Sequence, residues 1–320
     1  MWHPKIALSE KIQGKLNHLR VQVSILTEGL LTSIKVFNNW GDVVLFKLGL
    51  LKNLNLRLRD GRKVIIEGRS EYAKKFPPLL CEGKALREKS HIKFGRYKVR
   101  VGNAEFSYSN KEEYLTVLMQ INEVFLDKAY AWLSVRNKNV IDIGANIGDT
   151  AIYFALNGAK KVYSLEPYPY SFNILQKNLK ANALTGKVTA INAGIGEKDG
   201  LIKIKQTYRN YGGDDLKHFR NGKKIPIMCL KSLLNTYEID DAVLKMDCEG
   251  GEYSSILTST RETLRKFSQI QMEYHYGYIL LEKHLKECGF RVRHTLPNHI
   301  YNQQASDSDM YLGFIYAERI

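Results

Sequence analysis

Cysteine is scarce in this chain of 320 residues, and its four copies lie far apart, at Cys81, Cys229, Cys248 and Cys288. Because none of them forms a C-x-x-C pair, the sequence excludes a zinc-ribbon framework and disfavours a disulfide scaffold. No apolar run approaches the roughly 18 residues of a membrane-spanning helix. Seven prolines and 24 glycines make up less than a tenth of the chain, which excludes collagen-like and broadly disordered proteins. The first 15 residues lack the layout of a secretory signal, so we expect a cytoplasmic protein.

Acidic residues are few in the first part of the chain. Residues 1–139 contain 25 Lys and Arg against 13 Asp and Glu, whereas the remainder contains 23 and 20. Most of the net charge of +15 therefore belongs to the first part. A basic segment attracts phosphate, as found in nucleic acid, sugar nucleotides, lipid-linked phosphates and anionic membranes. We expect a phosphate-bearing substrate there, or a peripheral contact with a membrane surface; a solvated basic face without a partner is the alternative.

Residues 1–128 mix helical and strand patterns and are expected to form a smaller basic α+β region. Apolar residues recur at helical spacing at Ile12, Leu16, Leu19, Val23, Leu26 and Leu30. Leucines alternate over 54–58, before the turn at Asp60-Gly61, and Val64 and Ile66 follow it, which predicts a β-hairpin. A second hairpin is predicted around Gly102-Asn103, and residues 111–136 are predicted as a helix that leads into the next strand.

From Asn139 onward, strand and helix patterns alternate, which predicts a doubly wound parallel sheet for a second domain at 129–320. The last two strands, at 290–294 and 310–317, have only a polar loop between them, so they are expected to form a terminal antiparallel hairpin. The polar loop at 206–224 is long, and such loops are often lids.

The sharpest motif is VIDIGANIGDT at 140–150, where a buried strand turns into a helix. Ligands of doubly wound sheets bind at the carboxyl ends of the strands. A dinucleotide fold needs glycines at positions 144, 146 and 149, but Asn146 and Asp149 occupy two of them. An acid at the start of a helix also repels a pyrophosphate. The motif therefore disfavours a dinucleotide and favours a cofactor without phosphates, S-adenosylmethionine.

The predicted cofactor-binding residues are Asp142, Gly144, Asn146, Gly148, Glu166 and Asn192. Asp142 is expected to receive the ammonium of the cofactor's tail, directly or through water, and backbone amides near Gly144 its carboxylate. Glu166 ends the second strand and is expected to accept hydrogen bonds from both ribose hydroxyls. Asn192 closes the third strand, where the adenine is expected.

The blocks DIGANIGDT, LEPYPYSFNILQKNLKANAL, INAGIG, LKMDCEGGEYSSIL and QMEYH occur in this order, and together they resemble the FkbM family of S-adenosylmethionine-dependent methyltransferases. The resemblance covers roughly residue 129 to the end, and the D-x-E-G-x-E block is its most specific part. It implies a class I methyltransferase (Rossmann-like) fold and O-methylation of hydroxyls on sugars, glycans or polyketides.

The predicted catalytic residues are Lys245, Asp247, Glu273 and His275. In a strand, alternate residues share a face, so Lys245 lies with Asp247, and Glu273 with His275. Methyl transfer to an alcohol needs alignment, exclusion of water and an acceptor for the hydroxyl proton. In one mechanism His275 or Asp247 is that base. Lys245 has an equally weighted alternative, an internal ion pair with an acid.

In the second mechanism, which we consider the weaker, Asp247, Glu249 and Glu273, with or without His275, hold a divalent cation that lowers the pKa of the alcohol. Oxygen ligands favour Mg²⁺ or Mn²⁺ over zinc. Favourable placement near a helix N-terminus also explains Glu249 and Glu252 without a metal.

Three functions are open from the sequence. The leading one is O-methylation of a sugar, a glycan or a lipid-linked saccharide. The second is methylation of RNA held by the basic region, although no RNA-recognition motif is visible in residues 1–139. The third is a non-catalytic binding module, which the acids at the strand ends argue against.

Overall fold

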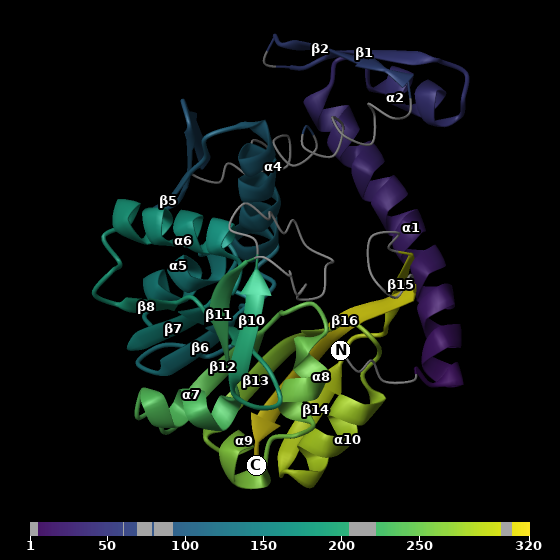
Figure 1. The fold of residues 1–320 in the computed structure, drawn as a ribbon. Helices are drawn as coiled ribbons and strands as arrows, with labels where there is room; N and C mark the ends of the chain where they lie inside the picture. Colours follow the sequence, from purple (N-terminus) through teal and green to yellow (C-terminus); the bar gives the residue numbers. More distant parts are fainter. Residues whose placement is uncertain (1–5, 60, 69–78, 80–91, 205–221, 302–308) are drawn as a thin grey trace. The chain divides into compact units, whose positions relative to one another are not determined.

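The computed structural model describes residues 6–59, 61–68, 79, 92–204, 222–301 and 309–320. Its contacts group the chain into two compact units, one formed by residues 1–18 and 129–320 and the other by residues 19–128. The first unit carries the α/β architecture expected from residue 129 onward (Figure 1). This unit also includes the first 18 residues, whereas the sequence patterns grouped them with the rest of residues 1–128.

The first unit is built on a sheet with the order β14-β16-β13-β12-β6-β7-β8. The strands are β6 (Asn139–Ile143), β7 (Lys161–Leu165), β8 (Val188–Ile191), β12 (Ala242–Met246), β13 (Phe267–Tyr274), β14 (Phe290–His294) and β16 (Asp309–Arg319). The pairs from β8 across to β13 are parallel, while β16 runs antiparallel to both β13 and β14. The predicted doubly wound sheet with a terminal antiparallel hairpin is therefore confirmed. A short strand, β15 (Asn298–Tyr301), pairs with the start of β16.

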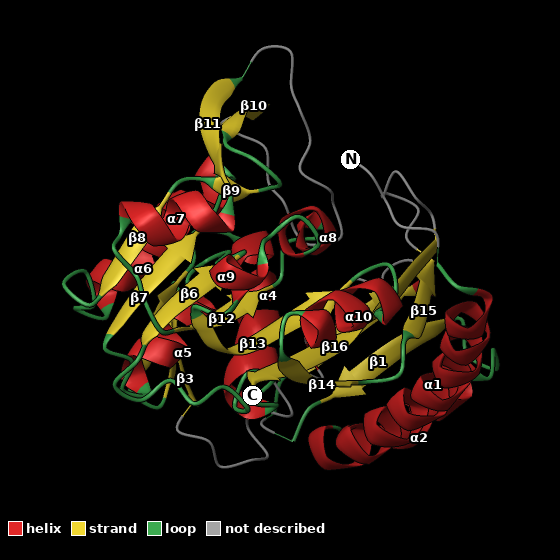
Figure 2. Ribbon diagram, turned by 90° about the horizontal axis from the view of Figure 1, so that it is seen from below, coloured by secondary structure: helices red, strands yellow, loops and turns green. Residues whose placement is uncertain are grey.

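Helices cover both faces of this sheet (Figure 2). The apolar side chains of one face pack with those of α7 (Leu230–Thr236), α8 (Gly251–Ile256), α9 (Arg261–Leu264) and α10 (Ile279–Glu287) in one core. Helices α5 (Asp149–Leu156) and α6 (Pro169–Ala181) contact β6, β7 and β8 and lie outside that core, on the other face. Alternation along β12 therefore directs Leu244 into the first core and Lys245 toward the face of α5.

A small sheet of β9 (Gly194–Ile195), β10 (Gly200–Ile204) and β11 (Lys223–Met228) follows β8. The polar loop predicted at 206–224 lies between β10 and β11 and, except for its last three residues, outside the described residues. Of the four cysteines, Cys81 is also outside them, and Cys229, Cys248 and Cys288 are free thiols.

The second unit contains most of α1 (Leu8–Val36), and α2 (Trp40–Lys47), β1 (Asn53–Arg57) and β2 (Lys63–Glu67). As predicted, β1 and β2 form an antiparallel hairpin. The second predicted hairpin is the pair β4 (Lys98–Val101) and β5 (Ala104–Ser107), to which β3 (Ile92–Gly95) adds a third strand.

The helix predicted over 111–136 is shorter than expected. Helix α4 (Lys111–Gln120) runs into a π-helical turn, η1 (Ile121–Leu126), and ends there. The residues from Ala129 are irregular and lie along the main sheet, because Gln271 donates to the Ala129 carbonyl (2.7 Å) and the Ser134 amide to the Gln269 side chain (2.7 Å). Apolar spacing alone cannot distinguish such a segment, packed on a sheet, from a helix.

The start of α1 is attached to the first unit by a buried acid. Glu10 accepts hydrogen bonds from the amides of Tyr278 (2.6 Å) and Ile279 (3.0 Å), where α10 begins. A carboxylate at this position stabilises the positive end of the helix. Among the described helices, none is long and apolar enough to cross a membrane.

Candidate active site

The glycine motif forms a tight loop at the carboxyl end of β6. Gly144 and Gly148 have φ angles of 76° and 89°, and Asn146 has 44°. A Cβ on Gly144 would lie 1.6 Å from the carbonyl oxygen of Asp247. Only glycine fits there, because the loop passes directly against the backbone after β12.

The loop uses its own amides to hold its shape. The amides of Gly144 and Ala145 donate to the Leu165 carbonyl (3.1 and 3.0 Å), and that of Asn146 donates to Glu166 (2.9 Å). These three amides are therefore not directed at a ligand. The expected contact between an amide near Gly144 and the cofactor's carboxylate does not come from these three and stays a prediction.

Glu166 lies buried just past the end of β7. One of its oxygens accepts from the Asn146 amide and the other from the Tyr168 amide, both at 2.9 Å. Burial raises the pKa of Glu166 to about 8, against these two hydrogen bonds. Each carboxylate oxygen can accept a further hydrogen bond, as two adjacent hydroxyls would offer. The side-chain amide of Asn192 holds the backbone at Glu166 in place, because it donates to the carbonyls of Glu166 (2.8 Å) and Pro167 (3.1 Å).

Asp142 and Lys245 form an internal ion pair beneath the loop. Lys245 Nζ lies 3.4 Å from Asp142 Oδ1 and donates to the carbonyls of Gly144 (2.9 Å) and Ile143 (3.2 Å). Asp142 also accepts from the hydroxyl of Thr150 at 2.9 Å. The side chains of Asp142 and Lys245 are 0% and 1% exposed. Of the two interpretations of Lys245, the structure shows the ion pair, and both residues hold the loop from within.

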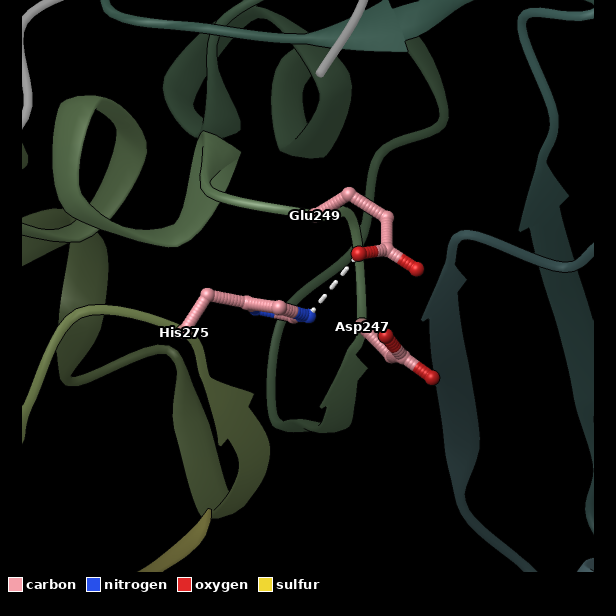
Figure 3. A group of neighbouring side chains, drawn as sticks. All are labelled: Asp247, Glu249 and His275. Atoms are coloured by element: carbon pink, nitrogen blue, oxygen red, sulfur yellow. Dashed lines mark ion pairs between the residues drawn. The ribbon is translucent and has the colours of Figure 1, made fainter. Parts of the chain in front are cut away.

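Asp247, Glu249 and His275, here called the Asp247 cluster, lie together beyond the ends of β12 and β13 (Figure 3). The ring of His275 is held between two carboxylates. Its Nε2 is 3.1 Å from Glu249 Oε2, and its Nδ1 is 3.3 Å from Glu252 Oε1. Glu252 is fully buried and accepts from the amides of Cys248 and Gly250 (both 2.9 Å).

The charges in this cluster are strongly coupled. Burial lowers the pKa of His275, but the carboxylates of Glu252 and Glu249 outweigh it and hold the pKa well above its usual value. Burial raises the pKa of Asp247. The charge of Lys245 lowers this pKa and that of Glu249 raises it, so the pKa stays above its ordinary value. Burial also opposes the charged form of Glu252, yet His275 keeps the pKa of Glu252 below its ordinary value. The raised pKa of His275 favours its protonated form, which leaves Asp247 as the better proton acceptor of the two predicted bases.

The Asp247 cluster is also the group that could hold a metal ion. One ligand atom from each of its three residues lies within 4.8 Å of the others. Glu273, a predicted ligand and catalytic residue, is not part of this group among the described residues. The regular strand ends at Tyr274, so the alternation that placed Glu273 beside His275 does not continue to His275.

Tyr130 is a site residue that the sequence did not reveal. Its hydroxyl donates to Asp247 Oδ2 (3.2 Å), and its ring lies 5.3 Å from Lys245 Nζ. Phe154 and Phe314 contact the ring edge to face. Tyr130 belongs to the segment predicted as helix, and no spacing or motif in it points to the site.

The sheet order, with its antiparallel strand β16 between β13 and β14, is that of the class I fold of S-adenosylmethionine-dependent methyltransferases. Residues 142–292 match the sequence profile of the Methyltransferase FkbM domain. This match confirms the resemblance to the FkbM family over residues 142–292.

Two curated relatives are named for acceptors other than saccharides. The chain is 29% identical over 131 residues to tRNA (guanine(37)-N(1))-methyltransferase Trm5b of Methanocaldococcus jannaschii, covering 37% of this chain and 38% of that one. It is 37% identical over 70 residues to the ribosomal protein L11 methyltransferase of Carboxydothermus hydrogenoformans, covering 22% and 21%. The matches therefore span well under half the length of these relatives.

A solved structure of methyltransferase FkbM from Methylobacillus flagellatus KT is 14% identical to this chain, with a TM-score of 0.37. The alignment covers 78% of this chain and 60% of that one.

The residues at the sheet edge fit S-adenosylmethionine. Glu166 offers two buried carboxyl oxygens to a diol, and it brings no positive charge that would attract a phosphate to the same place. The loop of Gly144 and Gly148 brings the backbone close to this carboxylate.

Proposed function

We propose that the protein is an O-methyltransferase whose acceptor is a hydroxyl of a sugar, a glycan or a lipid-linked saccharide. The observation that carries this is Asp247, a partly buried carboxylate with a raised pKa that accepts a hydrogen bond from the Tyr130 hydroxyl. An alcohol is a poor nucleophile until its proton has an acceptor, and a carboxylate with a raised pKa is a better one.

In this proposal, Asp247 would take the proton of the acceptor hydroxyl, whose oxygen keeps the electron pair. When bound, S-adenosylmethionine would supply the methyl group from its sulfonium and would leave as S-adenosylhomocysteine once the carbon–sulfur bond is broken. The pocket for this cofactor would be formed by Gly144, Asn146, Gly148, Glu166 and Asn192. Asp142 acts indirectly, through Lys245 and the loop.

A sugar acceptor suits the charge of the cluster. Two carboxylates and one imidazolium carry a net negative charge, and carboxylate oxygens accept hydrogen bonds from neutral hydroxyls. Glu249, 23% exposed, is available for such a contact. The basic first part of the chain would attract an acceptor that bears a phosphate.

The test compares Asp247→Asn with Asp199→Asn, the same change at an acid bound to Ser232. Labelled methyl transfer to oligosaccharides, sugar nucleotides and lipid-linked saccharides is measured together with S-adenosylhomocysteine affinity. Asp247→Asn should lower turnover by roughly a hundredfold or more and leave cofactor affinity within a few-fold. Normal turnover by this variant would remove Asp247 as the base, and methylation of none of the saccharides would remove the acceptor class.

The second candidate is an RNA methyltransferase, supported by the similarity to the archaeal tRNA enzyme and by the excess of Lys and Arg in residues 1–139. In that case, the protein would bind generic RNA with an affinity that falls steeply with salt and survives Asp247→Asn. A non-catalytic module, the third possibility, would fail to bind S-adenosylhomocysteine.

A further inference from the structure

Helix α2 is apolar on both of its faces, although only one of them is packed. Val43 and Phe46 are buried in a core with Leu54 and Leu56 of β1. At about 100° per residue, Trp40, Leu48 and Leu45 follow one another around the opposite side of the helix. A surface helix of a globular unit ordinarily carries polar residues on that side.

The unpacked side continues into the turn after the helix. The Leu50 amide donates to the Leu45 carbonyl (2.9 Å), which brings these two residues together. Trp40, Leu45, Leu48 and Leu50 are 38%, 40%, 68% and 69% exposed, and they are called the α2 patch below. Contiguous exposed apolar side chains of this kind mark interaction surfaces.

Basic residues outnumber acidic ones in the sequence around α2. The sequence from Lys35 to Lys63 holds seven Lys and Arg but only two Asp. One of these, Asp42, accepts from the side chain of its neighbour Asn39 (2.6 Å). Lys47 and Lys52, both exposed, lie next to the patch in the chain.

The hairpin that packs on α2 shows the same excess of charge. Arg57 faces Lys63 directly across the β1–β2 register, and both are exposed. Like charges opposite one another disfavour the hairpin unless an anion lies near them.

We propose that the α2 patch and its lysines form a docking surface for an anionic lipid bilayer. Leucine and tryptophan enter the boundary between headgroups and acyl chains, while lysines contact the lipid phosphates. A nucleic acid would engage the lysines but leave Leu48 and Leu50 in water. This inference goes beyond methyl transfer, and its test needs no turnover.

The experiment measures flotation of the full chain with vesicles of phosphatidylcholine alone and with a third of phosphatidylglycerol. Binding is expected only to the anionic vesicles. The double substitution Leu48→Ser and Leu50→Ser should lower the partition constant roughly tenfold or more. Neutralising Lys47 and Lys52 with Gln should lower it by roughly fivefold for each lysine, and added salt should do the same.

The matched control is the double substitution Leu201→Ser and Ile320→Ser, at residues 64% and 74% exposed in the other unit. It should bind vesicles as the unsubstituted protein does. Circular dichroism and S-adenosylhomocysteine affinity should be unchanged in all variants.

Three results would overturn the proposal. The first is failure of the unsubstituted protein to bind anionic vesicles, with or without binding to RNA. The second is equal loss of binding in the control. The third is a dimer that the Leu48→Ser and Leu50→Ser protein loses in light scattering, since the α2 patch would then face a second copy of the chain.

Discussion

The hydroxyl of Tyr130 donates a hydrogen bond to Asp247 across 3.2 Å, although 117 positions separate the two residues in the chain. The same ring lies 5.3 Å from the ammonium of Lys245, which in turn binds the Gly144 carbonyl. Tyr130 thus contacts both the acid proposed as base and the lysine that supports the cofactor loop. It therefore connects the predicted catalytic acid with the residues that hold the cofactor loop.

Replacing Tyr130 with Phe keeps the ring but removes the hydrogen bond. A hydrogen bond to a carboxylate favours the charged form, so its loss should raise the pKa of Asp247 further. The rising limb of the pH–kcat profile should move to higher pH, and kcat at neutral pH should fall about tenfold. Tyr163→Phe, at a ring packed against Tyr237 on α7's side of the sheet, is the matched control. An unshifted profile in Tyr130→Phe would show that this contact does not act on the base.

Glu166 should make cofactor binding depend on pH. Its pKa of about 8 means that it is mostly protonated at neutral pH before a ligand binds. Hydroxyl donors favour its charged form, so binding of S-adenosylhomocysteine should release protons, and affinity should rise as pH approaches about 8. Calorimetry at pH 7 in two buffers of different ionisation enthalpy measures this release. Glu166→Gln should weaken binding about tenfold and abolish the release; a pH-independent affinity in the unsubstituted protein contradicts the ribose assignment.

Much of the sheet could be predicted from the sequence, because each parallel strand is a short apolar run followed by a turn signal and a helix. The acids at the strand ends followed from the same pattern. What could not be predicted depends on contacts between distant segments. The sequence assigned Asp142 to the cofactor's ammonium and left Lys245 between catalysis and an internal ion pair, since a buried acid and a ligand-binding acid look alike in a sequence. Tyr130 and the attachment of Glu10 carry no local pattern at all.

The ion pair of His275 with Glu252 should make stability depend on pH. The folded pKa of His275 lies well above 6.5, so its stabilising contribution is complete below pH 6.5 and is lost as pH rises through the folded value. The folded pKa of Glu252 is lowered, so its contribution is present above pH 4.5 and is lost as pH falls through the folded value. The pair therefore stabilises the fold most between about pH 4.5 and 6.5.

Thermal unfolding from pH 4 to 10 tests this. His275→Gln should lower the free energy of unfolding by about 3 kcal/mol near pH 6, because it leaves a buried carboxylate without its partner. The difference from the unsubstituted protein should shrink at alkaline pH. His284→Gln, on α10, is the control. A difference that stays constant across the pH range would mean that His275 is not charged in the folded protein.

Removal of divalent ions should leave the reaction rate unchanged, because Asp247 acts as the base and His275 carries a proton. Nε2 of His275 lies 3.1 Å from Glu249 Oε2, and a metal ion that takes Nε2 as a ligand would have to displace a proton held there. Mn²⁺ should therefore bind weakly at pH 6 and more tightly at pH 9, which paramagnetic resonance of free Mn²⁺ can follow without an acceptor. Glu249→Gln should abolish the binding at pH 9 while retaining turnover in chelator. If chelator instead stopped turnover, and Mn²⁺ or Mg²⁺ restored it only when Glu249 is present, the cluster would be a catalytic metal site and Asp247 a ligand rather than the base.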